Sequence, residues 1–210
     1  MGSRVEHLAV YLAGQLSLDE DDRDVIRFGL ELVVSTALSL GATLTLALAV
    51  GVVKPVLAAL LVFTPVRTQA GGAHNSSPGL CAVVTALTFT LLGWLAMRVG
   101  PWVGTHISLF LGGSFVVALV ANHLWAPVET PNKPISRRQR EKLRRRTLVA
   151  LVAVTAALTS LAMMGSQEVA VYIAAGGLAL LVQSLVISTW GIVFFDKMDK
   201  VLSLSWARRR

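Results

Sequence analysis

The chain has 210 residues, of which 54% are hydrophobic and only 15% are charged, and its mean hydropathy is +0.67. A soluble domain of this length cannot bury so much apolar surface, so the composition excludes a soluble protein and predicts an all-α integral membrane protein. The formal net charge is +7, and the single cysteine excludes an intramolecular disulfide.

The N-terminal segment has the spacing of a short amphipathic helix over residues 4–16. It is too short and too polar to span a bilayer, so it either lies in the membrane interface or packs on the helix bundle. Glu6 and His7 interrupt it and no cleavage site follows, so we expect no cleaved signal peptide. Residues 17–24 then supply a capping box and an acidic first turn for the next helix.

Apolar runs of spanning length predict the membrane segments. The run over 32–53 extends about 33 Å as a helix, enough for one span, whereas 54–66 is too short to cross alone. Either the first span ends near Gly41 and the second begins there, or 54–66 is a re-entrant segment. Four more runs follow, at 80–97, 102–125, 148–164 and 169–195. The sequence therefore predicts a single membrane-embedded domain over 1–210, with six spans or five and a re-entrant hairpin.

Basic residues set the expected orientation. Eight of them lie between Lys133 and Arg146 and five more follow Phe195, so we expect the loop over 127–146 and the tail over 196–210 to be cytoplasmic. Counting spans backwards from this loop places residues 67–81 at the cytoplasmic face, and six spans place both termini there. The same loop could attract nucleic acid, but no aromatic residues interleave its cations, so we expect membrane lipid as its partner and no nucleic acid.

The polar segment over residues 67–81 contains the features most typical of a reactive site. Cys81 is the only cysteine, and six residues separate it from His74. Ser76 and Ser77 followed by Pro78 are typical of a helix start, which puts Cys81 in the first helical turn. The partial positive charge there favours the thiolate, so Cys81 and His74 form a candidate nucleophilic pair, against the alternative of an inert buried cysteine.

Other polar residues within the runs suggest less. The four histidines have no cysteine or carboxylate beside them at ligand spacing, so we expect no metal ion and no cofactor. Asn122, with His106 and His123, is interpreted as lining the bundle. We interpret Gln183 as a packing residue and Glu168 as a loop residue.

Two separated motifs resemble the AgrB family of bacterial quorum-sensing membrane endopeptidases. The first is Arg67, then Gly71-Gly72-Ala73-His74 and then Cys81; the second is Ala126-Pro-Val-Glu-Thr-Pro-Asn-Lys-Pro-Ile135. The chain length, the N-terminal amphipathic helix and the hydrophobic profile are similar to the family as well.

The resemblance implies an activity at the cytoplasmic face of a bacterial membrane. The enzyme would cut the C-terminal tail from an AgrD-like precursor peptide through a Cys81 thioester, and promote cyclisation of the peptide to a thiolactone or lactone. It implies that Cys81 is the nucleophile and His74 the acid and base, and that the chain forms a homodimer. Gly71 and Gly72 would offer N–H groups to the oxyanion, Gln69 and Ser77 are candidates to orient His74, and Arg67 either contacts a substrate carboxylate or anchors the loop.

Two other classes stay open from the residues alone. A small peptide transporter or export protein without protease activity would explain the polar residues in the spans, and a lipid-bound scaffold protein would explain the basic loop. Neither needs Cys81 or His74, so the loss of one of these residues distinguishes both classes from the enzyme.

Overall fold

The computed structural model describes residues 2–16, 20–72, 78–128 and 136–207. These residues form helices and no strand, which confirms the all-α prediction. The helices are α1 (Gly2–Leu16), α2 (Glu20–Val50), α3 (Val53–Ala70), α4 (Pro78–Thr105), α5 (Ile107–Trp125), α6 (Arg137–Ala162), α7 (Gln167–Ile187) and α8 (Thr189–Ala207). In this part of the chain five helices are long and apolar enough to cross a membrane, namely α2, α4, α5, α6 and α7.

Helix α3 accounts for the ambiguous second run. It extends beyond the predicted 54–66, through Pro65 and Arg67 to Ala70, yet it is not one of the five candidate spans. Gly51, with φ of 77°, separates it from α2, which ends at Val50 rather than near Gly41. Of the two alternatives for this region, an early end of the first span near Gly41 is therefore wrong.

Two predicted boundaries lie elsewhere. The break expected at Arg98–Pro101 is wrong, because α4 continues to Thr105 and the chain turns at His106. Pro101 lies inside α4 near its end, where a proline removes only one hydrogen bond from the helix, and Arg98 lies over the Trp94 ring at 4.9 Å. The single run over 169–195 is also divided, since α7 ends at Ile187 and the Ser188 Oγ accepts a hydrogen bond from Gly191 N at 3.0 Å, as a helix N-cap does.

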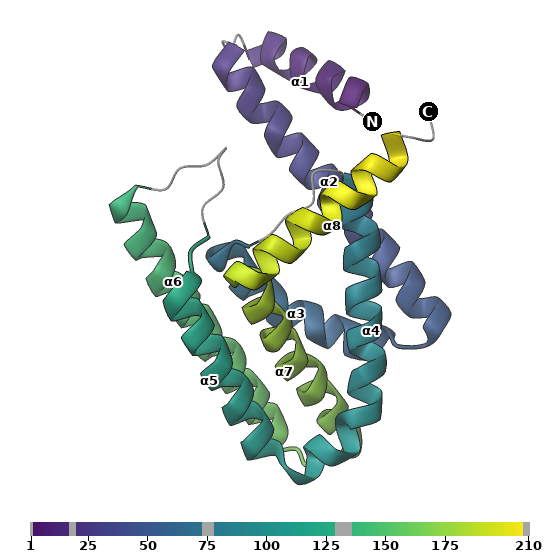
Figure 1. Ribbon diagram of the computed structural model, residues 1–210, viewed down its shortest axis with the longest axis vertical. Helices are drawn as coiled ribbons and strands as arrows, with labels where there is room; N and C mark the ends of the chain where they lie inside the picture. Colours follow the sequence, from purple (N-terminus) through teal and green to yellow (C-terminus); the bar gives the residue numbers. More distant parts are fainter. Residues whose placement is uncertain (1, 17–19, 73–77, 129–135, 208–210) are drawn as a thin grey trace.

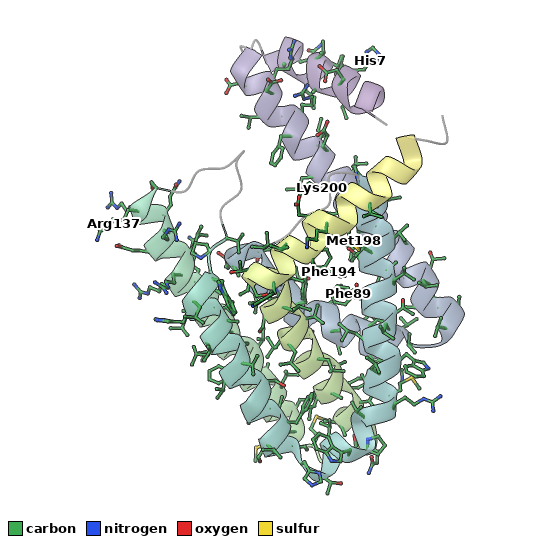
Figure 2. All side chains as sticks on the ribbon, in the orientation of Figure 1. His7, Phe89, Arg137, Phe194, Met198 and Lys200 are labelled. Carbon is green, nitrogen blue, oxygen red and sulfur yellow. The ribbon has the colours of Figure 1, made fainter. Side chains whose placement is uncertain are left out.

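The expected basic loop and tail are largely helical. Residues 137–146 form the first turns of α6, because Ser136 and Gln139 make a capping box and arginine, lysine and glutamate are good helix formers. Arg137 projects away from the other helices at this end of α6 (Figure 2). Likewise α8 continues to Ala207 within the segment predicted as a tail.

Helix α7 forms the centre of the bundle, between α5 and α4 in Figure 1, and also packs on α3. Of its apolar segment 67% is buried, against 17% for α2 and α6. Adjacent glycines permit the close approach: a Cβ on Gly176 would lie 2.9 Å from Leu158 of α6, and one on Gly177 would lie 2.3 Å from Phe110 of α5. Small residues at helix contacts are the usual means of close packing between membrane helices.

Contacts at the two ends complete the fold. The termini lie at the same end of the molecule (Figure 1), where α1 packs on α2 through buried Ala9 and Ala13 and through an Arg27–Glu6 ion pair of 3.2 Å. Elsewhere Lys54, in the first turn of α3, forms a 2.7 Å ion pair with Glu168, in the first turn of α7. The Lys54–Glu168 pair thus joins the start of α3 to the start of α7.

Candidate active site at the junction of two loops

Two glycines turn the chain sharply where α3 ends. Gly71 has φ of 71° and ψ of −151°, and Gly72 has φ of 136°. These backbone conformations are accessible essentially to glycine alone. The sequence Gly71-Gly72 therefore determines the path of the chain as it leaves α3 toward α4.

Arg67 holds this turn from the last turn of α3. Its Nη1 donates a hydrogen bond to the Gly71 carbonyl at 2.9 Å, and a Cβ on Gly72 would lie only 1.8 Å from the same nitrogen. Burial lowers the pKa of Arg67 to about 10, and the nearby Cys81 acts in the opposite direction by favouring the charged guanidinium. Arg67 therefore anchors its own loop and lies within electrostatic reach of the cysteine.

Cys81 lies in the first turn of α4 and is partly exposed. Helix α4 begins at Pro78, as the sequence predicts, so the orientation of its peptide dipoles favours a negative charge near the sulfur. His74 and Ser77 lie outside the described residues.

The start of the second motif, residues 126–128, lies directly on the glycine turn, and residues 129–135 lie outside the described part of the chain. Val128 N donates to the Ala70 carbonyl at 2.9 Å, and a Cβ on Gly71 would lie 3.1 Å from the Val128 carbonyl oxygen. Ala126 packs in a small apolar cluster with Ala70 and Ile187. The two motifs that sequence reasoning identified separately thus meet at the glycine turn.

Gln183 of α7 completes this arrangement, and sequence reasoning assigned it only to packing. Its side chain is 1% exposed, and its Nε2 donates to the Gly71 carbonyl at 3.3 Å. Its Oε1 is buried and has no hydrogen-bond partner among the residues that the structure describes. One signal was available in the sequence, since an amide in an apolar run is costly unless it has a partner.

The N–H groups of Gly71 and Gly72 differ in whether they already make a hydrogen bond. The Gly71 N–H donates to the Arg67 carbonyl at 3.0 Å, so the expectation that it is free for an oxyanion is wrong. The Gly71 N–H makes this bond because it satisfies one of the carbonyl groups left at the end of α3. The Gly72 N–H makes no hydrogen bond in the part of the chain that the structure describes.

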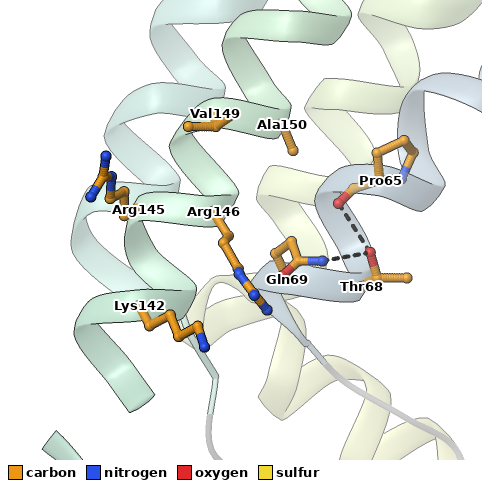
Figure 3. Close-up of a pocket in the computed structure, with 8 residues that line it drawn as sticks. All are labelled: Pro65, Thr68, Gln69, Lys142, Arg145, Arg146, Val149 and Ala150. Atoms are coloured by element: carbon orange, nitrogen blue, oxygen red, sulfur yellow. Dashed lines mark hydrogen bonds between the residues drawn. The ribbon is translucent and has the colours of Figure 1, made fainter. Parts of the chain in front are cut away.

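The remaining candidates lie apart from this turn. Gln69 faces α6 and lines a hollow there (Figure 3), and His106 is exposed at the junction of α4 and α5. Asn122 is buried and, with His123, lines a second hollow of about 450 Å³ between α5 and α6. Among the described residues no three histidine, cysteine or acidic side chains form a group that could hold a metal ion.

Comparison with known proteins gives one consistent result. A family model described as "Accessory gene regulator B" matches residues 5–187. "Putative AgrB-like protein 2" of Clostridium perfringens is 26% identical over 142 residues, which are 64% of this chain and 64% of that protein. "Accessory gene regulator protein B" of Staphylococcus intermedius is 26% identical over 70% of this chain and 76% of that protein, and its Staphylococcus aureus counterpart is 23% identical over 63% and 68%.

The chain spans less than two thirds of the length of the clostridial relative. No solved structure matches the chain.

Proposed function

Because the chain belongs to the accessory gene regulator B (AgrB) family, we propose that it is a multi-pass membrane cysteine endopeptidase of the agr quorum-sensing system. Its proposed substrate is an AgrD-like precursor peptide, from which it removes the C-terminal tail before the peptide cyclises. The observation that carries this proposal is the glycine turn, which Arg67, Val128 and Gln183 hold from three separate elements near Cys81.

The first half of the proposed reaction forms an acyl-enzyme. His74 takes the proton from the Cys81 Sγ, and the thiolate attacks the scissile carbonyl of the precursor. The tetrahedral intermediate collapses as the C–N bond breaks, and His74 gives its proton to the leaving amine of the tail. The N-terminal part of the peptide is then held on Cys81 as a thioester.

The second half closes the ring. An internal cysteine thiol or serine hydroxyl of the peptide attacks the thioester carbonyl and gives its proton to His74. The C–S bond to Cys81 breaks, and the cyclic thiolactone or lactone is released as the cysteine regains its proton. Water must be excluded from the thioester, because hydrolysis competes with cyclisation. An internal nucleophile held close to the thioester carbonyl makes ring closure faster than hydrolysis.

Two further roles follow from the geometry of the turn. We assign the Gly72 N–H, rather than that of Gly71, as a donor to the oxyanion, because Gly71 N–H already closes α3. We assign Gln183 as the residue that positions the turn through the Gly71 carbonyl, with its unpartnered Oε1 available to an N–H of the bound peptide.

The orientation and assembly of the protein remain parts of the proposal. We place the site and both termini on the cytoplasmic side, which the basic start of α6 and the common position of the termini in Figure 1 support. The family membership supports a homodimer.

The test uses the full chain in a bilayer with a candidate precursor. Mass spectrometry should detect the shortened peptide and an acyl adduct on Cys81. Cys81→Ala and His74→Ala should each abolish cleavage, whereas His106→Ala, which changes an exposed histidine away from the turn, should leave it intact. Full processing by Cys81→Ala would refute the mechanism, and movement of intact peptide across the bilayer without cleavage would support a transporter instead.

A further inference from the structure

A hollow of about 700 Å³ lies between the end of α3 and the first half of α6 (Figure 3). Pro65, Thr68 and Gln69 form its α3 side. It lies next to the glycine turn, because Gln69, which lines the hollow, precedes Gly71 by only two residues. The proposed peptidase reaction assigns no role to it.

Three cations of α6 line the hollow. Lys142, Arg145 and Arg146 are spaced three and four residues apart, so they share one face of the helix. All three are exposed, no acidic residue lines the hollow, and none of the three forms an ion pair in the described part of the chain. Arg145 also lines the second hollow, whereas Lys142 and Arg146 line only this one. Cations that border a hollow without a carboxylate favour an anionic ligand.

The remainder of the α6 side of the lining is apolar. Val149 and Ala150 follow directly along the same face of α6, and Pro65 faces them from α3 (Figure 3). The lining therefore changes from cationic to apolar within one helical turn, about 5.4 Å. A ligand that satisfies both halves has an anionic head and an apolar chain.

The position of α6 favours a lipid over a peptide. Only 17% of the apolar segment of α6 is buried in the protein, so most of this helix is left to meet the hydrocarbon of a bilayer. The cations lie where the charged start of α6 gives way to its apolar part, as expected at the level of lipid headgroups.

We propose that this hollow binds an anionic phospholipid. The lipid phosphate lies against Lys142, Arg145 and Arg146, and an acyl chain lies against Val149, Ala150 and Pro65. The site does not depend on the peptidase activity, and it ties the end of α3 to α6 beside the glycine turn.

Native mass spectrometry of the full chain tests the site. The protein is taken from bilayers of phosphatidylcholine mixed with phosphatidylglycerol, and the retained phosphatidylglycerol is measured. A basic residue near an anionic membrane surface contributes about 1 kcal/mol, so the triple change Lys142→Gln, Arg145→Gln and Arg146→Gln should weaken phosphatidylglycerol binding about a hundredfold.

Two further variants make the result specific. The change of Arg137, Arg138 and Arg140 to glutamine removes the same charge from the same helix outside the hollow, and it should retain the lipid. Ala150→Trp fills the apolar half without changing the charge, and it should release the lipid.

Equal loss of lipid in both charge variants would overturn the proposal, because the attraction would then come from diffuse charge. Retention of the lipid by Ala150→Trp would also overturn it. A glutamate-rich peptide that binds the hollow in phosphatidylcholine alone, and displaces phosphatidylglycerol, would replace the lipid with an acidic peptide as its ligand.

Discussion

Replacing Gly72 with alanine should disrupt the turn that carries the candidate site. The new Cβ would lie 1.8 Å from the Arg67 Nη1, a separation that no two unbonded heavy atoms can hold, and 3.1 Å from Val186. The guanidinium must therefore move, which breaks its hydrogen bond to the Gly71 carbonyl. At φ of 136° the alanine is also strained wherever the guanidinium goes.

The size of the effect follows from these two costs. Backbone strain of this kind costs about 1–3 kcal/mol. Loss of a hydrogen bond from a charged donor adds about 1.5–3 kcal/mol. The native turn should therefore be destabilised by about 2.5–6 kcal/mol relative to alternative loop conformations, which corresponds to a loss of processing of about fiftyfold or more.

The single cysteine makes the turn directly measurable. Cys81 is the only thiol, so the rate at which a maleimide labels the full chain reports the surroundings of this one residue. Gly72→Ala should change that rate and reduce processing. Gly51→Ala is the matched control, because Gly51 also has a positive φ, of 77°, but a Cβ there meets nothing within 4 Å.

A double-mutant cycle separates the backbone strain at residue 72 from the clash between the new Cβ and the Arg67 guanidinium. In an Arg67→Gln background the same change at Gly72 should cost about 1.5–3 kcal/mol less, since the guanidinium is already absent. If the cost is the same in both backgrounds, or if Gly51→Ala alters Cys81 labelling as strongly, the guanidinium does not lie over Gly72 and the reasoning fails.

Three other substitutions test the contacts of α7 with its neighbours. Gln183→Leu should reduce processing at least tenfold while it changes the free energy of unfolding by less than about 1 kcal/mol, because the lost hydrogen bond is offset by removal of a buried acceptor without a partner; an equal loss of stability and activity would contradict this. Gly177→Leu should destabilise the bundle by about 1–3 kcal/mol in chemical denaturation, whereas Gly112→Leu, at an open position of α5, should not. Lys54→Met should lower the unfolding temperature slightly at low salt and leave it unchanged at high salt, because Lys54 and Glu168 are exposed and salt screens their attraction. The hydrogen bond to Glu168 raises the pKa of Lys54, so the stabilisation is complete at neutral pH and is lost as the pH rises through that raised pKa. An effect that does not depend on salt would rule out an ion pair.

Hydrophobic pattern predicted most of the helices but not where some of them end. Run length identifies α4 and α5, yet α4 passes through Pro101, because a proline removes only one hydrogen bond from a helix and membrane helices tolerate that loss. The charged residues predicted a basic loop that ends where the apolar run begins. In the structure the capping box at Ser136 starts the helix earlier, so residues 137–146 and the apolar run belong to one helix, α6. A cap of one serine likewise divides the last apolar run at Ser188.

The candidate site was predictable only where its signals are local. Pro78 indicates a helix start from a single position and so places Cys81 in the first helical turn, and a glycine pair indicates an unusual turn. The contacts of that turn with Val128 and Gln183 join residues far apart in the sequence, and no periodicity or composition carries such information. The Gly71 N–H similarly becomes unavailable only because α3 runs on to Ala70.

The central position of α7 has a consequence for synthesis on the ribosome. Helices α3, α4 and α5 all pack on α7, which is made after them, and Gln183 lies near its end. Until α7 enters the membrane these earlier helices lack their common neighbour, and the glycine turn lacks its buried amide. The nascent chain therefore carries its cysteine through most of translation without an assembled site, and the site forms only when the second-last helix is inserted.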